Sequence, residues 1–184
     1  MVKEAFLCPH CGFYSTISLM AYHHSHHIYT CDKCDGITLL IIQNKEIVDQ
    51  YPKRVPKLDP AIPTDVANDY VEAVKCFDIG ANKASAVMCR RALQTSVVQK
   101  GAAKGKLNDQ IDELFKKGII TEDIMNWSHE IRLTGNIGAH PDQDGLENVT
   151  PQDAEELIKF MEEYLNYVYI MPAKVAEKRA RKTK

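Results

Sequence analysis

Residues 64–80 read TDVANDYVEAVKCFDIG, and this stretch indicates the fold of most of the chain. Its apolar residues recur at the spacing of one face of an α-helix. They are Val66, Tyr70, Val74 and Phe77. Thr64 is suited to cap the N-terminus of such a helix, and Gly80 is suited to end it. The stretch therefore predicts an amphipathic helix that packs one face against other elements.

Two further helices are expected after Gly80, because apolar residues return with the same period. The second helix is expected over residues 83–99, where Arg90 falls on the apolar face and should be paired and partly buried. The third helix is short, and the sequence Lys116-Lys117-Gly118 is typical of a helix C-terminus.

A fourth helix is expected from Thr121 and a fifth from Thr150-Pro151, where proline suits the first helical position. The inward face of the fourth helix is predicted to carry Ile124, Trp127 and Ile131. The fifth helix is expected to end at Pro172, before a basic tail over residues 173–184. We therefore predict a mainly α protein, in which residues 64–172 form a bundle of about five helices.

Two cysteine pairs lie in residues 1–51, which are predicted to form a separate small β domain. Each pair offers two thiolates from one tight turn, and two such turns facing each other complete a tetrahedral metal site. The spacing of the pairs is typical of a zinc ribbon. Strands are expected over residues 13–19, 37–42 and 46–51. Because four thiolates leave no position for a catalytic water, we expect one structural Zn²⁺ bound by Cys8, Cys11, Cys31 and Cys34.

Other interpretations of the small domain stay open. Paired cysteines can form a redox couple, although a reducing compartment favours metal ligation. The cluster His23-His24-Ser25-His26-His27 could replace a ligand or bind a second metal, but four cysteines already satisfy one zinc. We therefore interpret this cluster as a polar hairpin tip. His10, inside the first turn, is expected to be a spacer or a hydrogen-bond donor rather than a ligand.

Charge is unevenly distributed, although the net charge of the chain is only −2. Residues 52–63 contain four prolines and are expected to form an extended basic linker. Residues 64–172 have a net charge of −7, whereas residues 173–184 have +5. The acidic helical body favours a partner protein, and RNA or DNA would be bound by the basic linker and tail. A tail that is simply solvated is the other interpretation.

The sequence contains no targeting or membrane signal. No apolar run approaches the roughly 20 residues that span a bilayer, and the N-terminus lacks the apolar centre of a signal peptide. We therefore expect a cytoplasmic protein with no membrane partner.

A polar stripe is expected on the fourth helix, formed by Arg132, Asn136 and His140. Residues four apart on an α-helix are rotated by only about 40°, so the three side chains share one face. An arginine, an amide and an imidazole on one face can bind an anion such as a phosphate. The stripe is therefore the candidate catalytic site.

Two segments together resemble an uncharacterised bacterial family of the HEPN superfamily, named for higher-eukaryote and prokaryote nucleotide-binding domains. They are Val87-Met-Cys-Arg-Arg-Ala-Leu93 and Ile131-Arg-Leu-Thr-Gly-Asn-Ile-Gly-Ala-His140, which contains the pattern R-x-x-G-N-x-x-A-H. The resemblance covers about residues 64–170, here joined to a zinc ribbon. It implies an all-α bundle and a homodimer. In many members it also implies metal-independent cleavage of RNA in toxin, CRISPR or antiviral defence systems.

The spacing of the stripe departs from the superfamily signature, whose arginine and histidine are closer than the seven intervening residues found here. In an unbroken helix, the Cα atoms of Arg132 and His140 would lie about 12 Å apart along the axis. A bend at Gly135 and Gly138, or a site shared between two chains, would shorten this gap. The resemblance then implies that His140 acts as acid or base, Arg132 stabilises the phosphate and Asn136 orients the reacting groups.

The second function hypothesis is a non-catalytic protein-interaction module or accessory subunit of such a system. Arg132 would then pair with an acid such as Glu130 or Asp142. Gly135 and Asn136 would form the helix end, and His140 would make local hydrogen bonds. The sequence leaves open whether the protein is an enzyme.

Overall fold

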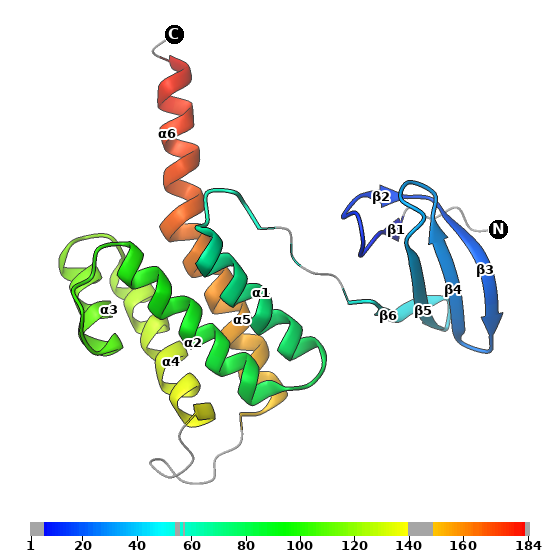
Figure 1. Cartoon of the computed structure of the whole chain (residues 1–184), viewed down its shortest axis with the longest axis horizontal. Coiled ribbons are helices and arrows are strands. Elements are labelled where there is room, and N and C mark those ends of the chain that lie inside the picture. The colour runs from blue at the N-terminus through cyan, green and yellow to red at the C-terminus, as the bar shows by residue number, and fades with distance from the viewer. Residues whose placement is uncertain (1–5, 54–55, 57, 140–148, 183–184) are drawn as a thin grey trace. The chain divides into compact units, whose positions relative to one another are not determined.

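The computed structural model describes residues 6–53, 56, 58–139 and 149–182 of the 184-residue chain (Figure 1). The chain divides into two compact units, residues 1–57 and residues 58–184. The first unit consists of β-strands and the second of helices. The prediction of a mainly α protein with a small N-terminal β region is confirmed. In the described residues, no helix is both long and apolar enough to cross a membrane.

The first unit contains two antiparallel sheets. β1 (Phe6–Leu7) pairs with β2 (Tyr14–Ser15) on either side of the first cysteine pair. The larger sheet has the order β3-β4-β5-β6, so each strand pairs with its neighbour in the sequence. Its strands are β3 (Ile17–His23), β4 (His26–Cys31), β5 (Ile37–Gln43) and β6 (Glu46–Tyr51).

The hairpin between β3 and β4 carries the histidine cluster. His23 lies directly opposite His26, so His24 and Ser25 alone form the turn, and His24 has a φ of 52°. The interpretation of the cluster as a polar hairpin tip is confirmed. β4 itself is not among the strands that the sequence predicts, because its leading histidines mask the alternation of apolar residues after them.

The second unit is a helical bundle in which α5 is followed without a break by a π-helix and a last α-helix (Figure 1). The helices are α1 (Thr64–Asp78), α2 (Asn82–Gln99), α3 (Leu107–Lys116), α4 (Glu122–Ala139), α5 (Pro151–Leu165), η1 (Asn166–Ile170) and α6 (Met171–Lys182). Thr64 is the first residue of α1 rather than its cap, which is Pro63. The start of α5 is as predicted, since Thr150 and Asp153 form a reciprocal capping box before Pro151.

α2 lies at the centre of the bundle and packs against α1, α3, α4 and α5. The buried residues of α2 are mostly small: Ser85, Ala86, Cys89, Ala92, Leu93, Ser96 and Val97. Small residues let the neighbouring helices approach closely, and the larger side chains of those helices fill the core. The largest of these fully buried side chains are Ile111, Leu114, Ile131, Met161, Tyr164 and Leu165.

An ion pair joins α1 to α2. Arg91 Nε lies 3.0 Å from Asp69 Oδ1, and the Thr95 hydroxyl donates to Asp69 Oδ2 over 3.0 Å. Asp69 is buried, so both contacts offset the desolvation of its carboxylate. Arg90 is partly buried, as the sequence predicts, and lies against α4, where it donates to Gln94 Oε1 over 3.3 Å. The ion pair with Asp69 belongs to its neighbour Arg91.

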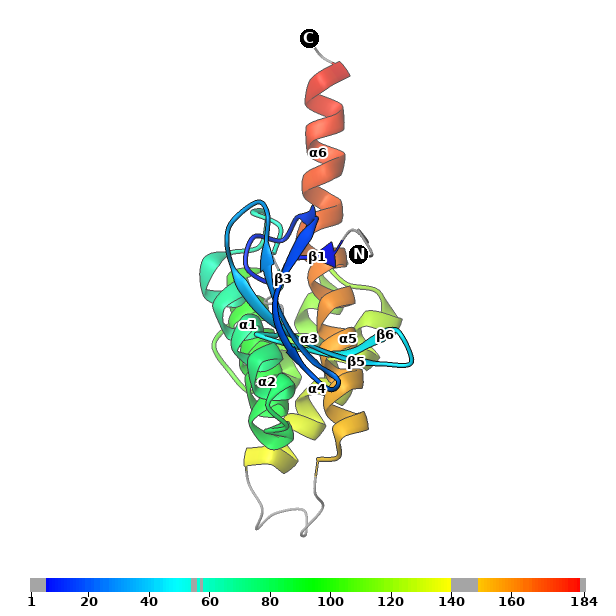
Figure 2. The ribbon, with the colours of Figure 1, turned by 90° about the vertical axis from the view of Figure 1, so that its right-hand side faces the viewer.

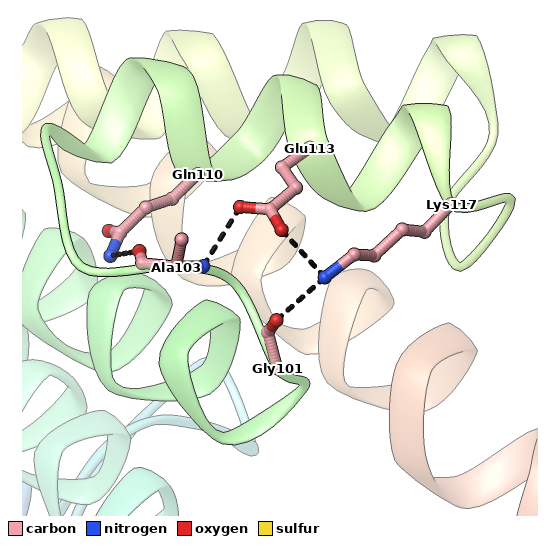
Figure 3. Close-up of polar contacts among 5 residues, drawn as sticks. All are labelled: Gly101, Ala103, Gln110, Glu113 and Lys117. Atoms are coloured by element: carbon pink, nitrogen blue, oxygen red, sulfur yellow. Dashed lines mark hydrogen bonds and ion pairs between the residues drawn. The ribbon is translucent and has the colours of Figure 1, made fainter.

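The loop between α2 and α3 is held by three side chains of α3 and the turn after it (Figure 3). Gln110 Nε2 donates to the Ala103 carbonyl over 2.9 Å, and the Ala103 N–H donates to Glu113 Oε2 over 2.8 Å. Lys117 Nζ donates to the Gly101 carbonyl over 2.7 Å and pairs with Glu113 over 2.6 Å. The hydrogen bond from Lys117, followed by that from Ala103, lowers the pKa of Glu113.

The last helix does not end at Pro172, so this predicted boundary is wrong. The Met171 N–H donates to the Asn166 carbonyl, the i+5 hydrogen bond of a π turn. Pro172 follows as the second residue of α6. In the first turn of a helix the missing N–H of proline is tolerated, so the π turn lets the chain continue as a helix to Lys182.

A buried cluster of hydroxyls anchors this junction to α2. Ser96 Oγ lies 3.0 Å from the hydroxyls of both Tyr164 and Tyr169. Burial raises the pKa of each tyrosine, so both hydroxyls are neutral at physiological pH. Hydrogen bonds between neutral hydroxyls, centred on Ser96, therefore hold this junction to α2.

We predict that Ser96→Ala lowers the free energy of unfolding by about 1–3 kcal/mol, because the buried Tyr164 hydroxyl loses its partner and the Tyr169 hydroxyl keeps only a 3.4 Å hydrogen bond to the backbone carbonyl of residue 96. The measurement is urea unfolding followed by far-UV circular dichroism. The control adds Tyr164→Phe and Tyr169→Phe to Ser96→Ala, which removes the unpaired hydroxyls and should recover part of the loss. A Ser96→Ala variant as stable as the parent would contradict this account of the junction.

Candidate functional sites

The two cysteine pairs converge in the first unit. All four Sγ atoms lie within 4.8 Å of one another. The Sγ atoms of Cys8 and Cys34 are 3.7 Å apart, and those of Cys11 and Cys31 are 3.9 Å apart. In a tetrahedral site with Zn–S bonds of about 2.3 Å, the sulfurs are separated by about 3.8 Å. The four cysteines are thus positioned as a metal site, and all four are free thiols.

Each cysteine pair lies on a tight turn that directs both thiols inward. The Gly12 N–H donates to the Cys8 carbonyl over 3.0 Å, and the Asp35 N–H donates to the Cys31 carbonyl over 2.9 Å. Gly12 and Asp35 both leave their turns in the left-handed conformation, with φ of 68° and 56°. These matched turns are the two cysteine knuckles that the sequence pattern predicts.

His10 connects the first knuckle to the strand after the second. Its Nε2 lies 2.8 Å from the Ile37 carbonyl, which can only accept, so the imidazole donates. His10 therefore acts as the hydrogen-bond donor that the sequence suggests. The imidazole also covers Gly36, where an added Cβ would lie 2.5 Å from the ring. The second knuckle therefore requires glycine at position 36.

The thiols do not ionise equally. Burial raises the pKa of Cys31, but hydrogen bonds from the backbone of Lys33 and the hydroxyl of Ser15 outweigh it and lower the pKa to about 6. A backbone hydrogen bond from Gly36 lowers the pKa of Cys34, yet burial and the neighbouring thiols raise it to about 12. Four adjacent thiolates repel one another, so their joint ionisation requires a cation among them.

The cysteines also account for much of the small core of the first unit. Its buried apolar residues are Phe6, Cys8, Cys31 and Leu40. Two of these four are candidate metal ligands, so little apolar surface remains to stabilise the sheets by burial alone. We therefore expect folding of this unit to be coupled to metal binding by its cysteines.

The predicted polar stripe lies on α4, which is a continuous α-helix from Glu122 to Ala139. Gly135 and Gly138 do not unwind this helix, and the alternative that Gly135 and Asn136 form its end is wrong. Arg132 is fully described, whereas Asn136 is described only as part of the helix, and His140 lies outside the described residues. The structure thus tests the surroundings of Arg132 but not the three residues together.

Gly135 is the point of closest contact between α4 and α2. A Cβ added there would lie 2.5 Å from Arg90 Cβ and 2.9 Å from the Ala86 carbonyl oxygen. Both atoms are fixed by the backbone of α2, so neither can move aside. Glycine at position 135 therefore permits this helix crossing. The crossing brings Arg90 of α2 against Gly135, which follows Arg132 by about one turn of α4.

Arg132 is partly buried on the flank of α4. Its Nε is fully buried and has no hydrogen-bond partner among the described residues, and none of the described acids forms an ion pair with its guanidinium. One turn earlier, His129 Nε2 lies 3.0 Å from Asp112 Oδ1 on α3. A buried guanidinium N–H without an acceptor is unfavourable, and the described residues supply none, so an acidic group is expected beside Arg132.

The inward face of α4 differs from the prediction at one residue. Ile124 and Ile131 are buried, but Trp127 is 37% exposed and stacks on Phe160 of α5, with ring centroids 5.0 Å apart. Ser128, which is buried and donates to the Ile124 carbonyl over 2.7 Å, takes a place on the inward face instead. A small hydroxyl residue there keeps α4 close to α2, as Gly135 does two helix turns later.

We predict that Gly135→Ala lowers the free energy of unfolding by about 1–3 kcal/mol, because the added methyl group forces α2 and α4 apart. The matched control is Gly105→Ala, where an added Cβ meets no atom within 4 Å. Thermal unfolding of the two variants should separate them clearly. Equal midpoints for both variants would mean that the helix crossing tolerates a side chain.

The comparison with known protein families concerns the helical unit. A family model described as a domain of unknown function, DUF4145, matches residues 71–182, from within α1 to the end of α6. No curated protein and no solved structure matches the chain. Because the matched segment is more than half of the sequence, the chain belongs to the DUF4145 family.

Proposed function

We propose that this protein is a nucleic-acid-associated, zinc-containing member of the HEPN superfamily that cleaves RNA without a catalytic metal. The observation that carries the proposal is the Arg132 guanidinium, with its buried Nε lacking an acceptor among the described residues. RNA phosphates are strong bidentate acceptors for arginine. The resemblance places the protein in a toxin, antiviral defence or mobile-element system of the cytoplasm.

The proposed reaction is transesterification at a phosphodiester. The ribose 2′-oxygen forms a bond to phosphorus, and the bond from phosphorus to the 5′-oxygen breaks, which leaves a 2′,3′-cyclic phosphate. His140 accepts the proton of the 2′-hydroxyl, and a water molecule donates a proton to the 5′-oxygen as it leaves. Arg132 stabilises the charge on the pentacoordinate phosphate, and Asn136 orients the hydroxyl.

The continuous helix favours a site shared by two chains. Without a bend, Arg132 and a residue eight positions later are separated by about 12 Å along the axis. Arg132 and Asn136, one turn apart, can contact one phosphate together. A histidine of a second chain can then reach this phosphate more easily than His140 of the same chain can.

The four cysteines support a structural Zn²⁺ as the metal of the first unit. Their separations fit thiolate ligands of zinc, and four thiolates close its coordination sphere. When bound, the ion supplies the positive charge that lets all four thiols ionise. Cys8, Cys11, Cys31 and Cys34 hold the two knuckles together through it.

A second candidate function is protein binding without catalysis. The net charge of −7 over residues 64–172 favours it, because an acidic body repels the phosphate backbone. In that case, the stripe receives a carboxylate of a partner protein rather than a phosphate. The zinc proposal is common to both candidates.

For the metal, we predict about one zinc ion per chain in protein purified without chelators. Elemental analysis by mass spectrometry measures the stoichiometry. Cys31→Ser removes one buried ligand and should lower the zinc content to less than about a tenth. Cys76→Ser, a thiol change on α1, is the matched control and should retain the metal. A parent protein without metal would refute the assignment.

For the reaction, we predict that the protein cleaves mixed RNA in the presence of EDTA and leaves 2′,3′-cyclic phosphate ends. His140→Ala should abolish cleavage, and Arg132→Ala should slow it by about 100-fold or more. His26→Ala, an exposed histidine of the β3–β4 hairpin, serves as the control and should cleave normally. Cleavage at the parental rate by His140→Ala would sink the catalytic proposal. RNA left intact by the parent would favour the protein-binding candidate.

A further inference from the structure

α6 extends beyond the other helices of its unit. Every residue from Met171 to Arg181 is exposed, and both views show α6 continuing from α5 past α1–α4 (Figures 1 and 2). An isolated helix of about 12 residues is only marginally stable in water, so packing normally supports such a helix. α6 therefore presents a helical surface on which a further element can pack.

One face of α6 combines apolar and basic side chains. Met171, Lys174, Val175 and Lys178 follow the spacing i, i+3, i+4 and i+7, so they lie together on one side of the helix. Met171 and Val175 are 50% and 49% exposed. Lys174 and Lys178 are exposed as well, and two like charges one turn apart repel each other. These four residues are named the α6 face.

An apolar hollow of about 480 Å³ adjoins the α6 face. Met171 and Val175 form part of its lining, and Ile119 and Val168 of the bundle form another part. Pockets of this volume with an apolar lining commonly bind apolar groups. The hollow therefore offers an anchor point for apolar side chains of a partner.

Lys100, at the end of α2, brings a positive charge to this hollow. Its ammonium group lies over the ring of Tyr169, 4.1 Å from the ring centroid, and burial lowers its pKa. None of the described carboxylates forms an ion pair with it. A carboxylate placed here would contact an ammonium that is partly removed from water, where the attraction between charges is stronger than at the open surface.

The charge of α6 indicates an acidic partner. α6 carries five basic residues and one acidic residue, and that acid, Glu177, already pairs with Arg181. Lys174 and Lys178 form no ion pair with the described acids. Carboxylates that lie between these two lysines and beside Lys100 would complement all three charges. Side chains three and four residues apart on a second helix match the one-turn spacing of the α6 face.

We propose that the α6 face and the adjoining hollow bind an acidic amphipathic helix of another protein. Apolar side chains of that helix enter the hollow beside Met171 and Val175. Its carboxylates pair with Lys100, Lys174 and Lys178 around the apolar centre, as the rim of a protein interface does. RNA fits this surface less well, because its affinity depends on phosphate contacts and the centre of the surface is apolar.

The proposed complex is independent of RNA cleavage. Both views show α6 at the opposite end of the bundle from the C-terminal end of α4 (Figures 1 and 2). A helix bound at α6 therefore leaves the end of α4 free for a second chain and for RNA. The two proposals can be tested separately.

The test is fluorescence anisotropy of a labelled synthetic helix mixed with the full chain. The probe is a peptide of about 18 residues, with leucines three and four residues apart, glutamates beside them and alanine elsewhere. We expect saturable binding, and Val175→Glu should raise the dissociation constant by about 100-fold or more. Ile79→Glu, a matched change at an exposed residue outside the hollow, should bind as the parent does.

A charge reversal tests the acidic character of the partner. Lys174→Glu with Lys178→Glu should weaken binding of the glutamate peptide by about 10-fold or more. The same double variant should gain binding of a peptide that carries lysine in place of glutamate. Hydrogen exchange checks the location, because bound peptide should protect the amides of α6. The substituted residues are exposed, so thermal unfolding should give the parental midpoint for each variant.

Three results would overturn the proposal: a parent that does not bind the glutamate peptide, undiminished binding by Val175→Glu, or protection elsewhere than α6. The proposal also fails if the parent binds a poly(U) probe through Lys174 and Lys178 but not the glutamate peptide, since α6 would then be a nucleic-acid arm. Peptide binding at α6 by a parent that cleaves no RNA would still support it, while the catalytic proposal would fail.

Discussion

The close approach of α2 and α4 at Gly135 is the constraint on which the rest of the helical unit depends. It requires small residues along α2, a glycine on α4 and larger side chains from the other helices to fill the core. The same crossing brings Arg90 of α2 against Gly135, which follows Arg132 by about one turn of α4. The glycine in the R-x-x-G-N pattern thus has a packing role that is independent of any reaction.

The β unit is stabilised in a different way. Its buried apolar residues are few, and two of them are cysteines whose thiols face the other two. The pKa of Cys31 is lowered whereas that of Cys34 is raised, and a cation among the four thiols would favour their joint ionisation. Metal binding and folding of this unit are therefore expected to be linked, whereas the helical unit has a large core of its own.

The sequence predicts those parts that rest on local patterns. Helix periodicity, the Thr150-Pro151 start and the knuckle spacing each correspond to a feature of the structure. It does not predict the continuation through Pro172, because the π turn there depends on Tyr164 and Tyr169 reaching Ser96 far away in the sequence. Likewise, Gly135 suggests a bend when only its own helix is considered, and its packing role becomes visible only with α2 in place.

The central claim is that the Arg132 flank of α4 contacts RNA. The most direct measurement is photocross-linking of RNA that contains 4-thiouridine, followed by mass spectrometry of the tryptic peptides. The account predicts cross-links to the peptides on either side of Arg132, residues 118–132 and 133–159. Cross-links confined to the β unit or to α6, with none on α4, would contradict it.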